Sequence, residues 1–142
     1  MIKAQEYKGK NVAVLGLGKS GLATIKSLKE VGANILAWDD DKKLISKLGN
    51  EGIEFSDLKD ANFKDISSLI LSPGVPLSYP SPHPVVKIAK KAGCEVIGDI
   101  ELFFRSKISG TVIGITGTNG KSTTTSLVSH VLAENSIKIQ MG

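Results

Sequence analysis

The sequence has one cysteine and no long apolar run. Cys94 alone forms neither an intrachain disulfide nor a cysteine zinc cluster, and we expect a small buried thiol within a strand. The absence of 18 or more consecutive apolar residues argues against a membrane-spanning helix. The first residues are charged and lack the apolar segment and cleavage site of a signal peptide. We therefore expect a cytoplasmic protein without membrane insertion.

Neither sign of charge is in large excess. The chain carries 18 lysine and arginine against 14 aspartate and glutamate residues, a formal net charge of +4. The basic residues are scattered, so a nucleic-acid surface is not indicated, whereas a small anionic ligand is compatible. His83 and His130 lack the spacing of metal ligands, and each is predicted to be structural or exposed. We expect a monomer.

Short apolar runs alternate with helical patterns along most of the chain. Such alternation predicts an α/β fold, a Rossmann-like parallel sheet with helices on both faces. The predicted strands are Asn11–Leu15, Asn34–Trp38, Ile53–Phe55, Ser68–Leu71, Cys94–Ile97, Thr111–Thr116 and, less clearly patterned, Ile137–Gln140. The predicted helices are Ser20–Val31, Lys42–Leu48, Pro84–Ala92, a short one capped by Asp99, and Lys121–Glu134.

The polar stretch Arg105–Gly110 has the composition of a hinge. It predicts a complete α/β domain over residues 1–107. Residues 108–142 would then form little more than a strand, a loop and a helix, which is too little to bury a core alone. The loop motif described below indicates that they are the start of a P-loop ATPase domain.

A first glycine-rich turn, G-x-G-x-x-G, lies between a predicted strand and a predicted helix. Its residues are Gly16, Leu17, Gly18, Lys19, Ser20 and Gly21. Such glycines let backbone N–H groups approach a pyrophosphate at a helix N-terminus. Asp39 follows at the position of a ribose-binding acid. Lys19 suits a diphosphate or a solvated surface charge equally well. Asp40 and Asp41 fit a helix cap and a solvated acid better than ligand groups.

The second turn, GITGTNGKSTTT at residues 114–125, departs from the general P-loop because Ile115 stands at the first glycine position. It fits the variant G-x-T-G-T-N-G-K-S between a strand and a helix. The N–H groups of Gly117, Thr118, Asn119, Gly120 and Lys121 can surround an anion. Lys121 would reach terminal phosphates, and the hydroxyl of Ser122 or Thr123 could coordinate Mg²⁺.

This variant loop resembles the ATP loop of the muramyl peptide ligases and the related folylpolyglutamate synthetase. Three more stretches, VAVLGLGKSGLA at 12–23, LILSPGVP at 69–76 and GDIELFF at 98–104, narrow the resemblance to the D-glutamate-adding branch of that ligase family. The resemblance covers essentially the whole chain. It implies a three-domain, ATP- and Mg²⁺-dependent C–N ligase of peptidoglycan synthesis that joins UDP-N-acetylmuramoyl-L-alanine and D-glutamate through an acyl phosphate.

The resemblance also implies roles for particular residues. Gly16–Gly21 would face the diphosphate of the substrate, Asp39 and Asp40 would lie near the uridine, and Ser72, Pro73 and Gly74 would line the same cleft. Gly117–Thr123 would hold ATP, with Lys121 on the phosphates and Ser122 on Mg²⁺. Lys121 and the metal would stabilise the transferring phosphoryl group.

The sequence alone leaves other functions open. In the resembled family the remaining catalytic residues lie beyond the matched stretch, so we expect no ligase activity from this polypeptide by itself. The G-x-G-x-x-G turn with Asp39 also fits an NAD-binding oxidoreductase, although such an enzyme has no use for the second loop. A non-catalytic, regulatory nucleotide-binding module is the third alternative.

Overall fold

The computed structural model describes residues 4–48, 53–106 and 110–141 of the chain. The chain divides into two compact units, Met1–Ile108 and Ser109–Gly142. The boundary that the sequence predicts between residues 107 and 108 lies outside the described residues.

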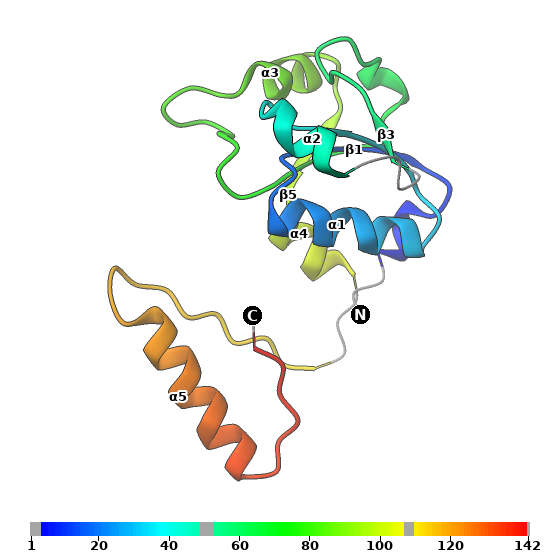
Figure 1. Ribbon diagram of the computed structural model, residues 1–142. Coiled ribbons are helices and arrows are strands. Elements are labelled where there is room, and N and C mark those ends of the chain that lie inside the picture. Colours follow the sequence, from blue (N-terminus) through cyan, green and yellow to red (C-terminus); the bar gives the residue numbers. More distant parts are fainter. Residues whose placement is uncertain (1–3, 49–52, 107–109, 142) are drawn as a thin grey trace. The chain divides into compact units, whose positions relative to one another are not determined.

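The first unit is built on a parallel sheet (Figure 1). Within the described residues it has five strands in the order β3-β2-β1-β4-β5, and every neighbouring pair is parallel. The strands are β1 (Asn11–Leu15), β2 (Asn34–Trp38), β3 (Glu54–Phe55), β4 (Ser68–Leu71) and β5 (Glu95–Gly98). The predicted Rossmann-like α/β fold is therefore confirmed.

Helices cover both faces of this sheet. They are α1 (Lys19–Glu30), α2 (Lys42–Leu48), α3 (Pro84–Lys91) and α4 (Asp99–Arg105), with short 3-10 turns η1 (Gln5–Tyr7) and η2 (Phe63–Asp65). The sequence-predicted cap of α4 is wrong by one residue: Gly98 is the N-cap, and Asp99 is the first helical residue.

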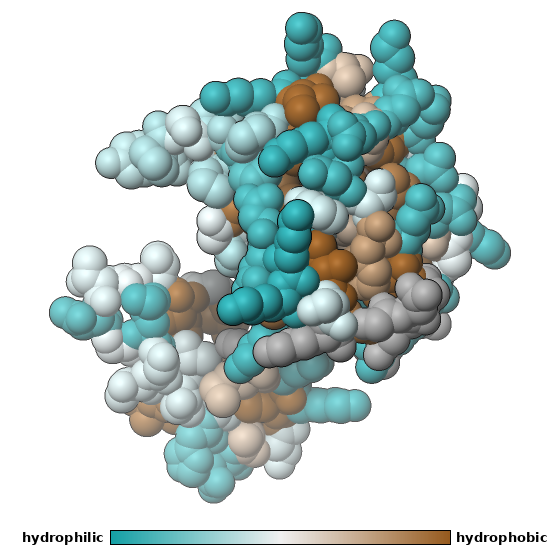
Figure 2. All heavy atoms as spheres, turned by 45° about the horizontal axis from the view of Figure 1, so that its top comes forward, coloured by the Kyte–Doolittle hydropathy of each residue, from teal (hydrophilic) through white to brown (hydrophobic). Residues whose placement is uncertain are grey.

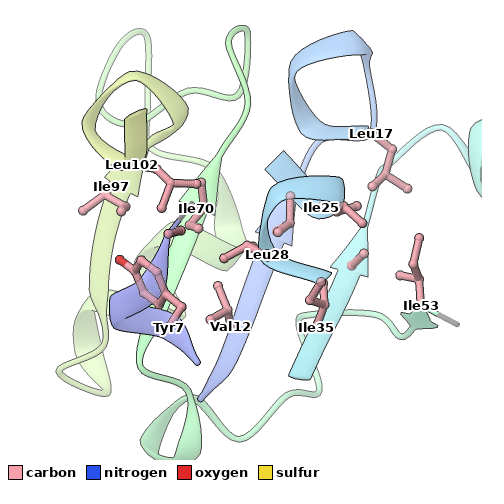
Figure 3. Close-up of a cluster of buried hydrophobic side chains, with 13 residues drawn as sticks. Tyr7, Val12, Leu17, Ile25, Leu28, Ile35, Ile53, Ile70, Ile97 and Leu102 are labelled. Carbon is pink, nitrogen blue, oxygen red and sulfur yellow. The ribbon is translucent and has the colours of Figure 1, made fainter. Parts of the chain in front are cut away.

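Two hydrophobic clusters lie on the two faces of the sheet. Side chains of α1 and α4, among them Ile25, Leu28 and Leu102, join Val12, Ile35 and Ile70 of the strands in the first cluster (Figure 3). The second cluster packs Val85, Val86 and Ala89 of α3 against alternate strand residues. Strands that are apolar on both sides thus become buried parallel strands, as their continuous apolar runs predict.

At the amino ends of β4 and β5, polar side chains form a connected network. Glu95 accepts hydrogen bonds from both terminal nitrogens of Arg105, each at 2.9 Å, and one from Ser68 Oγ at 2.9 Å. Arg105 Nε also donates to Glu101 at 2.8 Å. The Arg105 pair lowers the pKa of the Glu95 carboxyl. This network fastens the end of α4 to the edge strand β5.

The second unit contains helix α5 (Lys121–Glu134), at the predicted residues. The strands predicted at Thr111–Thr116 and Ile137–Gln140 are wrong, because both segments lack strand structure. An apolar, β-branched run becomes a strand only beside a partner strand, and the described residues of this unit contain none. Leu127 and Val131 of α5 are exposed, and Figure 2 shows hydrophobic side chains at the surface of this unit.

Candidate functional site

A cleft of the first unit lies at the carboxyl ends of β1 and β4. In the sheet, β1 is followed along the chain by its neighbour β2 on one side, and β4 is followed by its neighbour β5 on the other side. The strand order therefore reverses between β1 and β4. Open α/β sheets bind ligands at this kind of switch point. A cavity of about 390 Å³ opens here, and its walls are Gly16, Gly18, Lys19, Ser20, Asp39, Leu44, Ser72, Pro73, Gly74 and Val75.

The turn between β1 and α1 is held in a shape that only glycine allows. Gly16 has a φ of +96°, and a side chain there would press on Ser72. A Cβ atom on Gly21 would collide with the Gly16 carbonyl oxygen. Gly18, by contrast, has open space around it and is the N-cap of α1. Two of the three motif glycines are therefore required by packing, and the third leaves the helix end open.

The N-terminus of α1 faces the cleft without a side-chain cap or an acidic residue in its first turn. The first N–H groups of a helix have no intrahelical partner and carry partial positive charge. Lys19 is exposed and Ser20 is half-buried at this position, and both line the cavity. The arrangement offers backbone donors, a cation and a hydroxyl to an anion, as a diphosphate requires.

Asp39 accepts two backbone hydrogen bonds, one of which comes from the glycine-rich turn. Its Oδ2 accepts from the N–H of Leu17 at 2.6 Å, and its Oδ1 accepts from the N–H of Asp41 at 2.8 Å. Asp41 in turn accepts from the N–H of Lys43 at 3.0 Å and so caps α2, whereas Asp40 pairs with His83. Asp39 lines the cavity, and its carboxylate also holds the neighbouring backbone in place.

A smaller cavity of about 130 Å³ adjoins the first one. It shares Gly16, Asp39, Gly74 and Val75 with the larger cavity and adds Leu15, Asp40, Pro76 and His83. His83 Nε2 lies 2.8 Å from Asp40 Oδ2. The sequence gives no sign of this pair, because 43 residues separate its members and His83 belongs to no recognisable motif.

Most residues predicted for the first site come together in these cavities. Gly16, Gly18, Lys19, Ser20, Asp39, Ser72, Pro73 and Gly74 line the larger cavity, and Asp40 lines the smaller one. Leu17 is buried in the hydrophobic core instead, and Gly21 is buried in the turn. Sequence reasoning missed Leu44, Val75, Pro76 and His83, which come from elements whose placement depends on the whole sheet.

The second glycine-rich loop, Gly117–Thr123, lies in the second unit. Gly117 and Gly120 have positive φ values of 155° and 75°, and Gly120 is the N-cap of α5 without a side-chain cap. Lys121 Nζ donates to the carbonyl oxygens of Gly117 at 2.6 Å and Thr118 at 3.3 Å. Ser122 and Thr123 are exposed. The loop thus has the glycine conformations and the open helix end that suit a phosphate.

Two negative findings hold for the residues that the structure describes. No group of three or more histidine, cysteine, aspartate or glutamate side chains is arranged to hold a metal ion. None of the helices in residues 4–48, 53–106 and 110–141 is long and apolar enough to cross a membrane.

The fold and the cleft define a Rossmann-like α/β protein with a site where such folds bind nucleotides. The family model for the Mur ligase MurD-like N-terminal domain matches residues 10–98. The chain therefore belongs to this family. The resemblance drawn from the sequence motifs is thereby confirmed.

Curated relatives match over the whole chain. The UDP-N-acetylmuramoylalanine–D-glutamate ligase of Mesorhizobium japonicum is 50% identical over 100% of this chain and 31% of its own length. The proteins of the same name from Chelativorans sp. and Bartonella henselae are 47% and 46% identical, with 31% and 33% of their lengths covered. The chain thus spans about a third of the length of these relatives.

Among solved structures, shikimate dehydrogenase from Aquifex aeolicus is similar with a TM-score of 0.54. The similarity covers 70% of this chain and 46% of the dehydrogenase, at 19% sequence identity. At this identity the likeness concerns the Rossmann-like fold alone.

Proposed function

We propose that the chain is the N-terminal part of an ATP-dependent C–N ligase that adds D-glutamate to UDP-N-acetylmuramoyl-L-alanine in peptidoglycan synthesis. The names of relatives 46–50% identical over the whole chain support this activity. In the proposed reaction, ATP converts the substrate carboxylate to an acyl phosphate, which the amine of D-glutamate attacks. The first unit would hold the uridine diphosphate part of the substrate.

The open N-terminus of α1 is the observation that carries the substrate assignment. Backbone donors at Gly18–Ser20 and the cation of Lys19 meet at one end of a cavity of about 390 Å³. A diphosphate placed there would accept from the helix N–H groups and be neutralised by the lysine. Ser72, Pro73 and Gly74 would line the same cavity, and Asp39 and Asp40 would lie near the uridine.

Gly117–Thr123 would bind the phosphates of ATP. The positive φ of Gly117 and Gly120 and the uncapped end of α5 support this role. Lys121 would exchange its bonds to the loop carbonyls for the phosphates, and Ser122 would be a ligand of Mg²⁺. ATP supplies the phosphoryl group, while Lys121 and the loop N–H groups orient it and stabilise its charge.

The NAD-dependent alternative has less support. Each carboxylate oxygen of Asp39 already accepts one backbone hydrogen bond and has one further acceptor site, so Asp39 does not decide between the alternatives. Gly117–Thr123 has no use in a dehydrogenase. The cytoplasmic location, the monomeric state and the domain boundary near residue 107 remain predictions.

Thermal unfolding with separate ligands tests the proposal. A ligand that binds only the folded state raises the melting temperature, and the stabilisation grows with the logarithm of the ratio of ligand concentration to dissociation constant. We expect UDP-N-acetylmuramoyl-L-alanine to raise it and NADH to leave it unchanged at equal concentration. Stabilisation by NADH alone would favour the oxidoreductase alternative.

A further inference from the structure

His83 uses both ring nitrogens to join three parts of the first unit. Its Nδ1 accepts from the N–H of Val85 at 3.2 Å and so caps helix α3. Because Nδ1 supplies a lone pair, the neutral ring carries its proton on Nε2, which donates to Asp40 Oδ2 at 2.8 Å. The ring is only 12% exposed, whereas the Asp40 side chain is 63% exposed.

The same histidine closes a proline-rich loop beside the nucleotide cleft. The backbone N–H of His83 donates to the Pro76 carbonyl oxygen at 2.9 Å, which joins the two ends of the loop Pro76–His83. Pro76, His83 and Asp40 all line the smaller cavity, which adjoins the proposed diphosphate site. The His83–Asp40 bond therefore ties this loop to the end of β2 across one wall of the cleft.

The bond from His83 restrains the Asp40 carboxylate beside the proposed anion site. An unpaired carboxylate would rotate freely and would repel a diphosphate in the adjoining cavity. The N–H of His83 fixes the orientation of the carboxylate and stabilises its negative charge. The same bond is the main cause of the lowered pKa of Asp40, to which Lys59 adds a smaller effect.

We propose that His83 is a positioning residue of the nucleotide cleft, which holds Asp40 and the Pro76–His83 loop in the arrangement that receives the nucleoside end of the ligand. This inference rests on the proposed function, since it assigns a role in binding UDP. In this proposal the His83 side chain has two functions, to cap helix α3 and to bond Asp40, and a substitution can remove one without the other.

Two substitutions separate these tasks. In His83→Asn the side-chain oxygen replaces Nδ1, so the cap of α3 remains and the bond to Asp40 is lost. In His83→Gln the amide nitrogen replaces Nε2, so the donor to Asp40 remains and the cap is weakened. The dissociation constant of UDP, measured by calorimetry, should rise about tenfold in His83→Asn and less than about threefold in His83→Gln. The melting temperature should fall more in His83→Gln.

A double-variant cycle and a matched control complete the binding experiment. In an Asp40→Ala background the effect of His83→Asn on UDP affinity should vanish, because the partner of the bond is absent. His130→Ala, which changes an exposed histidine of α5, should leave UDP affinity unchanged. If His83→Asn binds UDP like the unaltered chain, His83 is only a helix cap and the inference is wrong.

The ligand-free chain provides an independent readout. Carboxyl NMR should show the pKa of Asp40 rising toward its ordinary value in His83→Asn and staying low in His83→Gln. Equal Asp40 titrations in the two variants would contradict the proposed bond.

Failure of the unaltered chain to bind UDP would instead overturn the proposed function, and with it the ligand role of His83. If the unaltered chain binds UDP and His83→Asn binds it more weakly, the result supports both the proposed function and the positioning role of His83.

Discussion

Ser72 Oγ donates a hydrogen bond to the carbonyl oxygen of Gly16 at 2.7 Å, across 56 residues of sequence. Gly16 follows β1 and Ser72 follows β4, so the bond joins the two loops at the point where the strand order reverses. Both residues are buried and both line the cleft. The floor of the proposed nucleotide site is thus assembled by the fold itself, before any ligand binds.

Ser72→Ala should destabilise the chain by about 1–3 kcal/mol, because the buried Gly16 carbonyl loses its side-chain donor. Urea denaturation followed by circular dichroism measures the change. Ser78→Ala, at an exposed position of the neighbouring loop, is the matched control and should have almost no effect. Equal unfolding free energies for the two variants would mean that the Ser72 bond contributes nothing.

Substitutions at two glycines of the same turn should differ in how much they destabilise the fold. Gly21→Ala places a methyl group against the Gly16 carbonyl oxygen, so we expect a loss of about 1–3 kcal/mol or a failure to fold. Gly18→Ala has open space and a φ of −67°, so its free energy of unfolding should change by less than about 1 kcal/mol. Denaturation of both variants checks the contrast. A Gly18→Ala variant as unstable as Gly21→Ala would contradict this description of the turn.

Glu95 should make the stability of the chain depend on acid pH. Arg105 lowers the pKa of Glu95 in the folded state. The stabilising contribution of Glu95 is therefore complete above its ordinary pKa of about 4.5, and it is lost as the pH falls through the lower pKa of the folded state. Glu95→Gln should lose stability near neutral pH and show a weaker decline on acidification. Urea titrations at several pH values check this, and parallel curves for the two proteins would exclude the effect.

The 142-residue chain should bind Mg-ATP only weakly, with a dissociation constant above about 1 mM. Every residue of α5 is at least partly exposed, and Lys121 bonds to its own loop. An exposed loop screened by water gives electrostatic contacts little strength. Calorimetric titration measures the affinity. Submillimolar binding that Lys121→Ala abolishes would show this prediction to be wrong.

Local sequence patterns predicted the strands β1, β2 and β4 and the helices α2 and α5 at their observed bounds. These elements have strong apolar patterns bounded by glycine or polar residues, so short-range information suffices. Thr111–Thr116 has an equally strong pattern and is no strand, because a strand depends on a partner that the pattern does not encode. Cys94 is buried as expected but lies directly before β5.

In the candidate site, too, local patterns predicted some residues, whereas others depend on contacts between distant parts of the chain. The glycine-rich turn, Asp39 and Ser72–Gly74 were predictable because each lies at the end of a recognisable strand or in a known motif. The pairs His83–Asp40 and Ser72–Gly16 were not, since their members meet only after the sheet has formed its order. Leu17 belongs to the motif by sequence, yet its side chain is in the core.

UDP should bind at the switch point of the first unit, and an NMR titration of the unaltered chain with UDP decides whether it does. The amide signals of Gly18, Lys19 and Ser20 and those of Ser72–Val75 should shift saturably. Signals of Gly117–Thr123 should stay in place. Absence of shifts at Gly18–Ser20, or shifts confined to Gly117–Thr123, would contradict the account.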